Sequence, residues 1–173
     1  MIIRRERPGD TAAARAVQVA AFAAAAAEGD EPVEAGLLDE LRRDDGWMPE
    51  LSFVAEVDGE VVGHVVCTRG TVGADRRPAL GLGPIGVLPE RQGCGIGSAL
   101  VHAVVAVAEA REESLVALLG DPAFYGPLGF GPAAAAGVEA LDPSWGVHFQ
   151  VRVLDPSAVV AGPFVYAEPF TRL

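Results

Sequence analysis

Residues 86–98 read GVLPERQGCGIGS, and this stretch decides how the rest of the chain is interpreted. An apolar segment runs into Pro89, a turn with three alternating glycines follows, and an apolar helical pattern begins at Ser98. The glycines leave room for a ligand to approach the backbone closely. The free N–H groups at the start of the next helix supply donors and the positive end of a dipole. The pattern therefore predicts an anion-binding turn between a strand and a helix.

The spacing of these glycines excludes the two common nucleotide-binding motifs. A P-loop requires GxxxxGK[ST], and no lysine follows Gly97. A Rossmann fingerprint requires GxGxxG, whereas this loop reads GxGxG before Ser98. A structural turn that binds nothing is the alternative, but the order of strand, Pro89, loop and helix favours an anion site.

Apolar periodicity on both sides of the loop predicts a mixed α/β (α+β) fold. Asp58-Gly59 separates two Val-rich segments and predicts a hairpin, and the glycines and Pro84 of the next segment predict a bent or bulged strand. No linker or repeat divides residues 1–173, so we expect a single domain. The expected strands are residues 2–7, 51–57, 61–72, 79–88 and 115–119, with weak alternation at 147–153, and the expected helices are residues 12–26, 33–43 and 98–111, with helical turns at 122–128.

The amino-acid composition of the chain indicates which kinds of binding partner to expect. The 173 residues include 13 basic and 24 acidic side chains, and the net charge of -11 disfavours nucleic acid and anionic membranes and suits cationic substrates. Solubility alone also explains such a charge. No stretch approaches the roughly 18 apolar residues of a membrane span, and no signal sequence is visible, so we expect a cytoplasmic protein. Cys67 and Cys94 lack the grouping that a metal site requires, so we expect no metal.

The glycine loop also resembles the signature of the GNAT superfamily of acyl-CoA-dependent N-acyltransferases, which is Q/R-x-x-G-x-G/A at a strand-to-helix turn. Residues 92–97, QGCGIG, match this signature in full. Residues 118–125, LLGDPAFY, followed by Gly129-Phe130, are similar to the YhbS-like branch of the superfamily. Residues 61–65 and 164–166 are similar to the same branch, so the resemblance covers most of the chain.

This resemblance implies a central twisted, mostly antiparallel sheet that is splayed in the middle and flanked by helices on both faces. Acetyl-CoA would lie in the opening as cosubstrate, with its pyrophosphate on the N–H groups of residues 93–98 and its pantetheine arm along β-strand residues 85–87. An N–H near Val87 would stabilise the oxyanion. Many members carry a basic residue where Cys94 stands, so phosphate binding rests more on the backbone and on Arg91. The implied acetyl-CoA-binding residues are Ile85, Gly86, Val87, Gln92, Gly93, Cys94, Gly95, Ile96, Gly97 and Ser98.

The same resemblance makes Tyr125 the general acid that protonates the departing CoA thiolate, and a half-buried packing tyrosine is the alternative. His64 is the candidate general base because its ordinary pKa is suitable, yet a lone histidine in a Val-rich strand is also typical of a hydrogen-bonded core residue. Glu56 is a second candidate base, or else a solvated charge at a strand end. Asp121 either contacts the acceptor or caps the helix that begins at Pro122.

We therefore predict an N-acetyltransferase that moves an acetyl group from acetyl-CoA to an amine of a small molecule or a peptide. The resemblance implies that residues 27–45 would form one wall of the acceptor site, and an acidic wall suits a cationic amine. Two alternatives stay open: a non-catalytic acyl-CoA-binding sensor, which would not need Tyr125, and a ligand-free interaction domain. A homodimer also stays open. The acidic residues of the wall are Glu28, Asp30, Glu31 and Glu34.

Overall fold

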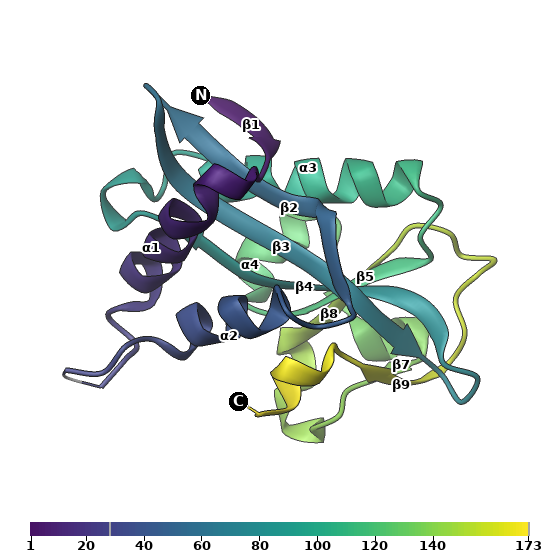
Figure 1. Cartoon of the computed structure of the whole chain (residues 1–173). Helices are drawn as coiled ribbons and strands as arrows, with labels where there is room; N and C mark the ends of the chain where they lie inside the picture. Colours follow the sequence, from purple (N-terminus) through teal and green to yellow (C-terminus); the bar gives the residue numbers. More distant parts are fainter. Residues whose placement is uncertain (28, 173) are drawn as a thin grey trace.

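A twisted sheet forms the centre of the computed structural model, which describes residues 1–27 and 29–172 (Figure 1). The strands are β1 (Ile2–Arg5), β2 (Trp47–Val57), β3 (Glu60–Val72), β4 (Arg77–Val87), β5 (Leu115–Leu119), β6 (Gly131–Pro132), β7 (Val138–Glu139), β8 (Phe149–Val153) and β9 (Gly162–Val165). The helices are α1 (Thr11–Phe22), α2 (Val33–Leu41), α3 (Ile96–Ala110) and α4 (Pro122–Tyr125), and two 3-10 segments near the C-terminus are Pro143–His148 and Glu168–Arg172.

The strands lie in the order β1-β2-β3-β4-β5-β8-β6, and β9 pairs with β3 outside this row. Every pair along the row is antiparallel except β4 with β5. The predicted turn at Asp58-Gly59 joins β2 to β3, with φ of 52° and 83°, the left-handed conformation that a type I′ hairpin requires. The structure thus confirms both the hairpin and the mostly antiparallel sheet.

The sheet opens between β4 and β5. These strands pair only where Leu80 faces Val116 and Gly81 faces Ala117. Beyond Gly81, β4 continues to Val87 with a partner on one edge only, β3, while β5 continues beside β8. The two strands therefore diverge, and the half of β4 from residue 82 to 87 has a free edge. This is the splayed sheet that the resemblance implied.

A bulge bends β4 at the same place. Val65 of β3 faces Ile85, but Cys67 faces Leu82, so β4 advances by one more residue than β3 between these two pairs. An extra residue on one strand bends that strand and increases its twist. The bulge predicted from the glycines and Pro84 is confirmed, and it turns the free half of β4 away from β5.

Helices cover both faces of the sheet. A Cβ built at Gly63 would lie 3.0 Å from Ile96 of α3, whereas one built at Gly86 would lie 2.8 Å from the side chain of Gln18 in α1. His64 stands opposite Gly86 in the register and so shares the α1 face. The predicted helices on both faces are therefore confirmed, with α1 and α2 on one side and α3 on the other (Figure 1).

The two largest errors in the predicted boundaries are four residues each. The first helix ends at Phe22 instead of residue 26, because the alanines that follow are exposed and their helix propensity has no packing to support it. The second strand begins at Trp47 instead of residue 51, because a register shift between Trp47 and Ser52 lets a segment with an irregular sequence pattern join the sheet. Among the described residues, no helix is both long and apolar enough to cross a membrane.

Candidate functional site

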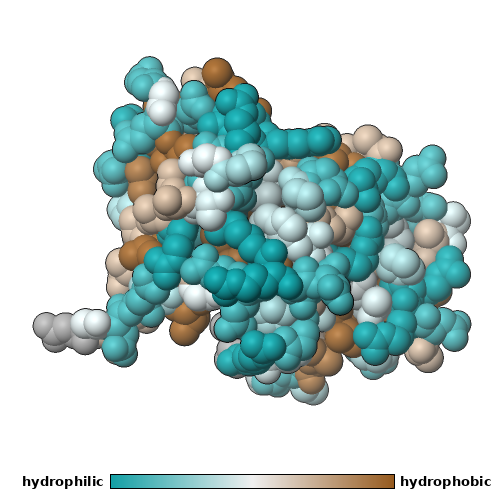
Figure 2. All heavy atoms as spheres, in the orientation of Figure 1, coloured by the Kyte–Doolittle hydropathy of each residue, from teal (hydrophilic) through white to brown (hydrophobic). Residues whose placement is uncertain are grey.

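A cavity of about 1240 Å³ lies at the opening of the sheet. Its walls come from the free half of β4, the glycine loop with the first turn of α3, and the segment from the end of β5 through α4. Side chains of α1, α2 and the C-terminal segment close the remaining sides. Figure 2 shows mostly polar residues over α2 and a mixture of polar and apolar residues over α1. The cavity thus coincides with the break in the sheet between β4 and β5.

The free edge of β4 presents backbone donors to this cavity. The amide of Leu88 donates to Val62 of β3, at 2.9 Å, so the N–H of this residue points away from the cavity. Backbone N–H groups alternate in direction along a strand, so those of Val87 and Ile85 point to the free edge. The Val87 carbonyl also points there, and it accepts a hydrogen bond from the side chain of Gln92, at 3.1 Å. The Val87 N–H remains available to a ligand.

The glycine loop presents a second set of donors. Gly93 and Gly95 adopt φ of 73° and 80°, a conformation that glycine reaches without strain, and Gly95 stands at the N-cap of α3. Within the described part of the chain, no hydrogen-bond acceptor engages the amides of residues 93–98. These amides point from the start of a 15-residue helix, where the helix dipole favours an anion.

Three side chains of the loop, those of Gln92, Arg91 and Cys94, have different positions relative to the cavity. Gln92 holds the carbonyl of Val87 and so fixes the loop to the end of β4. Arg91 lines the cavity and is the one basic residue among its lining residues. Cys94 is exposed and does not line it, unlike the other nine residues expected to bind acetyl-CoA.

Tyr125 lines the cavity across from β4. Its ring is 7% exposed and lies between Phe124 and Phe130, with ring centroids 4.7 and 5.7 Å away. Burial raises the pKa of the Tyr125 hydroxyl to about 12, so this group stays protonated at neutral pH. The carboxylate of Asp121 accepts a hydrogen bond from the Ala123 amide, at 2.9 Å, and so caps α4, which is one of its two expected roles, and Asp121 also lines the cavity.

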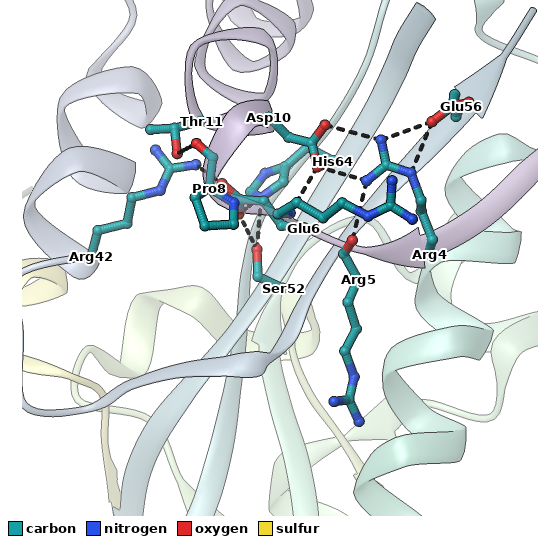
Figure 3. A network of polar contacts seen from close by, with 11 residues as sticks. Arg4, Arg5, Glu6, Pro8, Asp10, Thr11, Arg42, Ser52, Glu56 and His64 are labelled. Carbon is teal, nitrogen blue, oxygen red and sulfur yellow. Dashed lines mark hydrogen bonds and ion pairs between the residues drawn. The ribbon is translucent and has the colours of Figure 1, made fainter. Parts of the chain in front are cut away.

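His64 does not reach the cavity. Its side chain is fully buried, with Nδ1 2.9 Å from the amide nitrogen of Gln18 and Nε2 3.0 Å from the hydroxyl of Ser52. The Gln18 nitrogen can only donate, so Nδ1 accepts and Nε2 carries the proton. Glu6 lies 3.2 Å from Nε2 and also accepts from Ser52 (Figure 3). Burial lowers the pKa of His64, which keeps the ring neutral, and the structure supports the role of a core residue.

Two other acidic candidates, Glu56 and Glu31, also have structural partners. Glu56 binds Arg4, which in turn binds Asp10, on the outer edge of the sheet (Figure 3). Glu31 pairs with Arg15 and does not line the cavity. Glu28 lies outside the described residues. Of the predicted acidic wall, the structure brings Glu34 to the cavity.

Several cavity residues were missed by the sequence analysis. The aromatic side chains of Trp145, Tyr166 and Phe170 line the end of the cavity that lies farthest along β4 from the glycine loop. Nothing in the local sequence indicated that these rings would approach β4, because their neighbours show no regular periodicity. Among the described residues, no cluster of His, Cys, Asp or Glu could hold a metal ion.

Free amides at a helix N-terminus, beside an unpaired strand edge, suit a ligand that carries phosphate on an extended amide chain. This combination, on a splayed mixed sheet, defines an acyl-CoA-dependent acyltransferase. The chain belongs to the Acetyltransferase (GNAT) family, which matches residues 18–130, and it is an acetyl-CoA-dependent N-acetyltransferase.

Individual proteins that are similar to this chain are also N-acetyltransferases of this kind. The uncharacterized N-acetyltransferase YhbS of Escherichia coli K12 is 29% identical over 99% of both chains. The crystal structure of E. coli YhbS in complex with CoA has a TM-score of 0.87, covering 99% of this chain and 92% of that chain. A GNAT family acetyltransferase from Brucella melitensis, in complex with acetyl-CoA, is 33% identical, with a TM-score of 0.79 over 98% and 97% of the two chains. The uncharacterized N-acetyltransferase YjhQ of E. coli K12 is 34% identical over 58% of this chain and 57% of that protein.

Proposed function

We propose that the protein acetylates an amine by direct attack on acetyl-CoA, with the Val87 N–H as oxyanion donor and Tyr125 as general acid. The observation that carries this proposal is the position of the two groups on either side of the open sheet. The Val87 N–H points to the free edge of β4, and Tyr125 lines the same cavity from α4. A thioester held along β4 would lie between them.

Acetyl-CoA, the acetyl donor, would be held mainly by backbone groups and not by a pocket of cationic side chains. The amides of residues 93–98 would bind the pyrophosphate, and Arg91 would add the positive charge that the loop itself lacks. The pantetheine arm would extend along residues 85–87 and use the outward N–H and C=O groups of Ile85. Gln92 would keep the loop and the strand in register by its bond to Val87.

In the reaction, the neutral amine nitrogen attacks the thioester carbonyl carbon and forms the C–N bond. Negative charge develops on the carbonyl oxygen, where the Val87 N–H stabilises it. The C–S bond then breaks, and the thiolate takes the proton of the Tyr125 hydroxyl. The nitrogen that attacked releases one proton to solvent, and Tyr125 regains a proton from solvent. A buried phenol with a pKa near 12 is protonated whenever the thiolate needs a proton.

Replacement of Tyr125 by Phe tests this mechanism. We expect Y125F to lower kcat about 100-fold, the range that general acid catalysis supplies, while the Kd for acetyl-CoA changes less than about twofold. Thiol release measures the first quantity and calorimetry the second. A Y125F variant with full activity would exclude Tyr125 as the acid. A wild-type protein that binds acetyl-CoA yet releases no thiol with any amine would instead point to the sensor alternative.

A further inference from the structure

The cavity extends well beyond the part that acetyl-CoA would occupy. The residues expected to bind acetyl-CoA run from the glycine loop to Ile85, but the residues that line the cavity continue along β4 to Leu82. At about 3.3 Å per residue, the step from Ile85 to Leu82 adds roughly 10 Å to the cavity. The extra length ends against the C-terminal segment. A second molecule, and not more of the donor, fits this space.

Three aromatic rings form this far end, which we call the aromatic end and define as Trp145, Tyr166 and Phe170. The ring centroids of Trp145 and Tyr166 are 6.5 Å apart, and those of Tyr166 and Phe170 are 4.9 Å apart. Phe170 also approaches Gly83 of β4, where a Cβ would lie 4.0 Å from its ring. Leu141, 50% exposed, adds an apolar side chain to the lining of the same cavity.

Two polar groups in the cavity lack partners. The Tyr166 hydroxyl is buried and has no hydrogen-bond partner among the described residues, although Tyr166 lines the cavity. Glu34, half-buried on α2, forms no ion pair or hydrogen bond within residues 1–27 and 29–172. Arg91, the basic residue of the lining, belongs to the glycine loop. The charged side chains of the lining are thus positive at the loop and negative at Glu34 on α2 and at Asp121 before α4.

We propose that the acceptor is a small primary amine, cationic in solution, on an aromatic or similar apolar body that packs against the aromatic end. Glu34 attracts the ammonium group, and the rings of the aromatic end pack against the apolar body. Aromatic faces attract cations and bury apolar rings, so both parts of such a molecule gain from this site. This inference rests on the function proposed above and specifies the substrate class of the same site.

A panel of amines with the same reacting group tests the inference. We expect kcat/KM for 2-phenylethylamine to exceed that for ethylamine, which lacks the apolar body, by at least about tenfold. It should exceed by a similar factor the value for putrescine, which has a second cation in place of the ring. Equal values for the three amines would overturn the inference and leave the proposed function intact. No thiol release with any amine would overturn both.

A matched pair of lysine substitutions locates the binding site. Leu141 and Val147 are both exposed apolar residues close in sequence, but Leu141 lines the cavity and Val147 does not. We expect L141K to raise the KM for 2-phenylethylamine about tenfold, because the new charge repels the ammonium group, and to leave the Kd for acetyl-CoA unchanged. V147K should change neither value. An unchanged KM in L141K would overturn the assignment.

Variants of the aromatic end and of Glu34 complete the test. F170L keeps an apolar side chain and should raise the KM for 2-phenylethylamine but not for ethylamine. E34Q should raise the KM for both amines, less so at high salt. Thermal unfolding of each variant separates loss of the site from loss of the fold. Folded F170L and E34Q proteins with wild-type KM values would overturn the proposal.

Discussion

The ring of Tyr125 packs against the backbone of Gly120, so closely that a Cβ at residue 120 would lie 2.3 Å from the ring carbon Cε2. Real Cβ atoms do not come so close, and the ring edge is not a flexible chain end that could yield. Gly120 therefore fixes the position of the ring, and with it the direction of the hydroxyl. The glycine is a positioning residue for the proposed general acid.

Substitution of Gly120 by Ala should displace Tyr125. We expect G120A to lower kcat by about 10-fold to 100-fold, because a misplaced acid loses most of its effect, while the Kd for acetyl-CoA stays within about twofold. The control is G126A, since a Cβ at Gly126 meets nothing within 4 Å and its backbone is helical. If the kcat of G120A matched that of G126A, the positioning role would be excluded.

The pKa of Tyr125 sets the expected pH dependence. Burial raises this pKa to about 12, and an acid acts in its protonated form, so activity is lost only as pH rises through that value. We expect kcat/KM to rise with pH as the amine loses its proton, with no falling limb below about pH 10. Initial rates from pH 6 to pH 10 measure this profile. A falling limb near pH 8 would identify a different acid.

The left-handed glycines of the loop allow a test that separates strain from ligand binding. Gly95 in the loop and Gly59 in the β2–β3 hairpin have φ of 80° and 83°. An alanine at either residue costs about 1 kcal/mol of backbone strain. We expect G95A to raise the Kd for acetyl-CoA about tenfold and G59A to leave it unchanged, with similar losses of stability. Equal Kd values would mean that the loop amides do not bind the donor.

Arg91 should supply the charge that Cys94 does not. We expect R91A to raise the Kd for acetyl-CoA about fivefold at low salt, and the difference from wild type to disappear above about 0.5 M salt, where exposed charges are screened. R43A is the control, because Arg43 is exposed and does not line the cavity. A salt-independent effect of R91A would indicate lost packing instead of lost charge.

The sequence was sufficient for features that depend on neighbours along the chain. Asp58-Gly59 specified its own turn, the glycines of β4 specified a bulge, and the order of strand, loop and helix specified the start of α3 after the glycine turn. Each of these depends on local backbone conformation. The parting of β4 from β5 was reached only through resemblance, because the pairing of distant strands leaves no local pattern.

The role of His64 depended on register, which the sequence did not reveal. Side chains alternate between the two faces of a strand, so a shift of one residue would move His64 to the α3 face. The observed register places it opposite Gly86 and under α1, where Gln18 and Ser52 satisfy both ring nitrogens. The position of Phe170 also depends on contacts between segments far apart in the sequence, because its ring packs against buried leucines of α2.

The buried network around Glu6 predicts how the fold responds to acid. Burial alone would raise the pKa of Glu6, but hydrogen bonds from His64 and Ser52 and the charge of Arg42, 2.5 Å away, lower it to about 2. The pKa of His64 is also lowered, by burial. Ordinary values are about 4.3 for Glu and about 6.5 for His. Both groups thus bind fewer protons in the folded chain, which loses stability as pH falls.

Substitution of Glu6 by Gln tests this network. At pH 7, E6Q should lower stability by about 3 kcal/mol, because the largely buried Arg42 loses its nearest carboxylate and keeps the more distant Asp39, 3.7 Å away. The contribution of an ionised Glu6 is complete above about pH 4.3 and declines toward pH 2, so the difference in Tm between wild type and E6Q should shrink across that window. E31Q, which removes a half-exposed carboxylate, should change Tm little at any pH. A pH-independent difference for E6Q would show that packing, and not the charge of Glu6, stabilises this part of the fold.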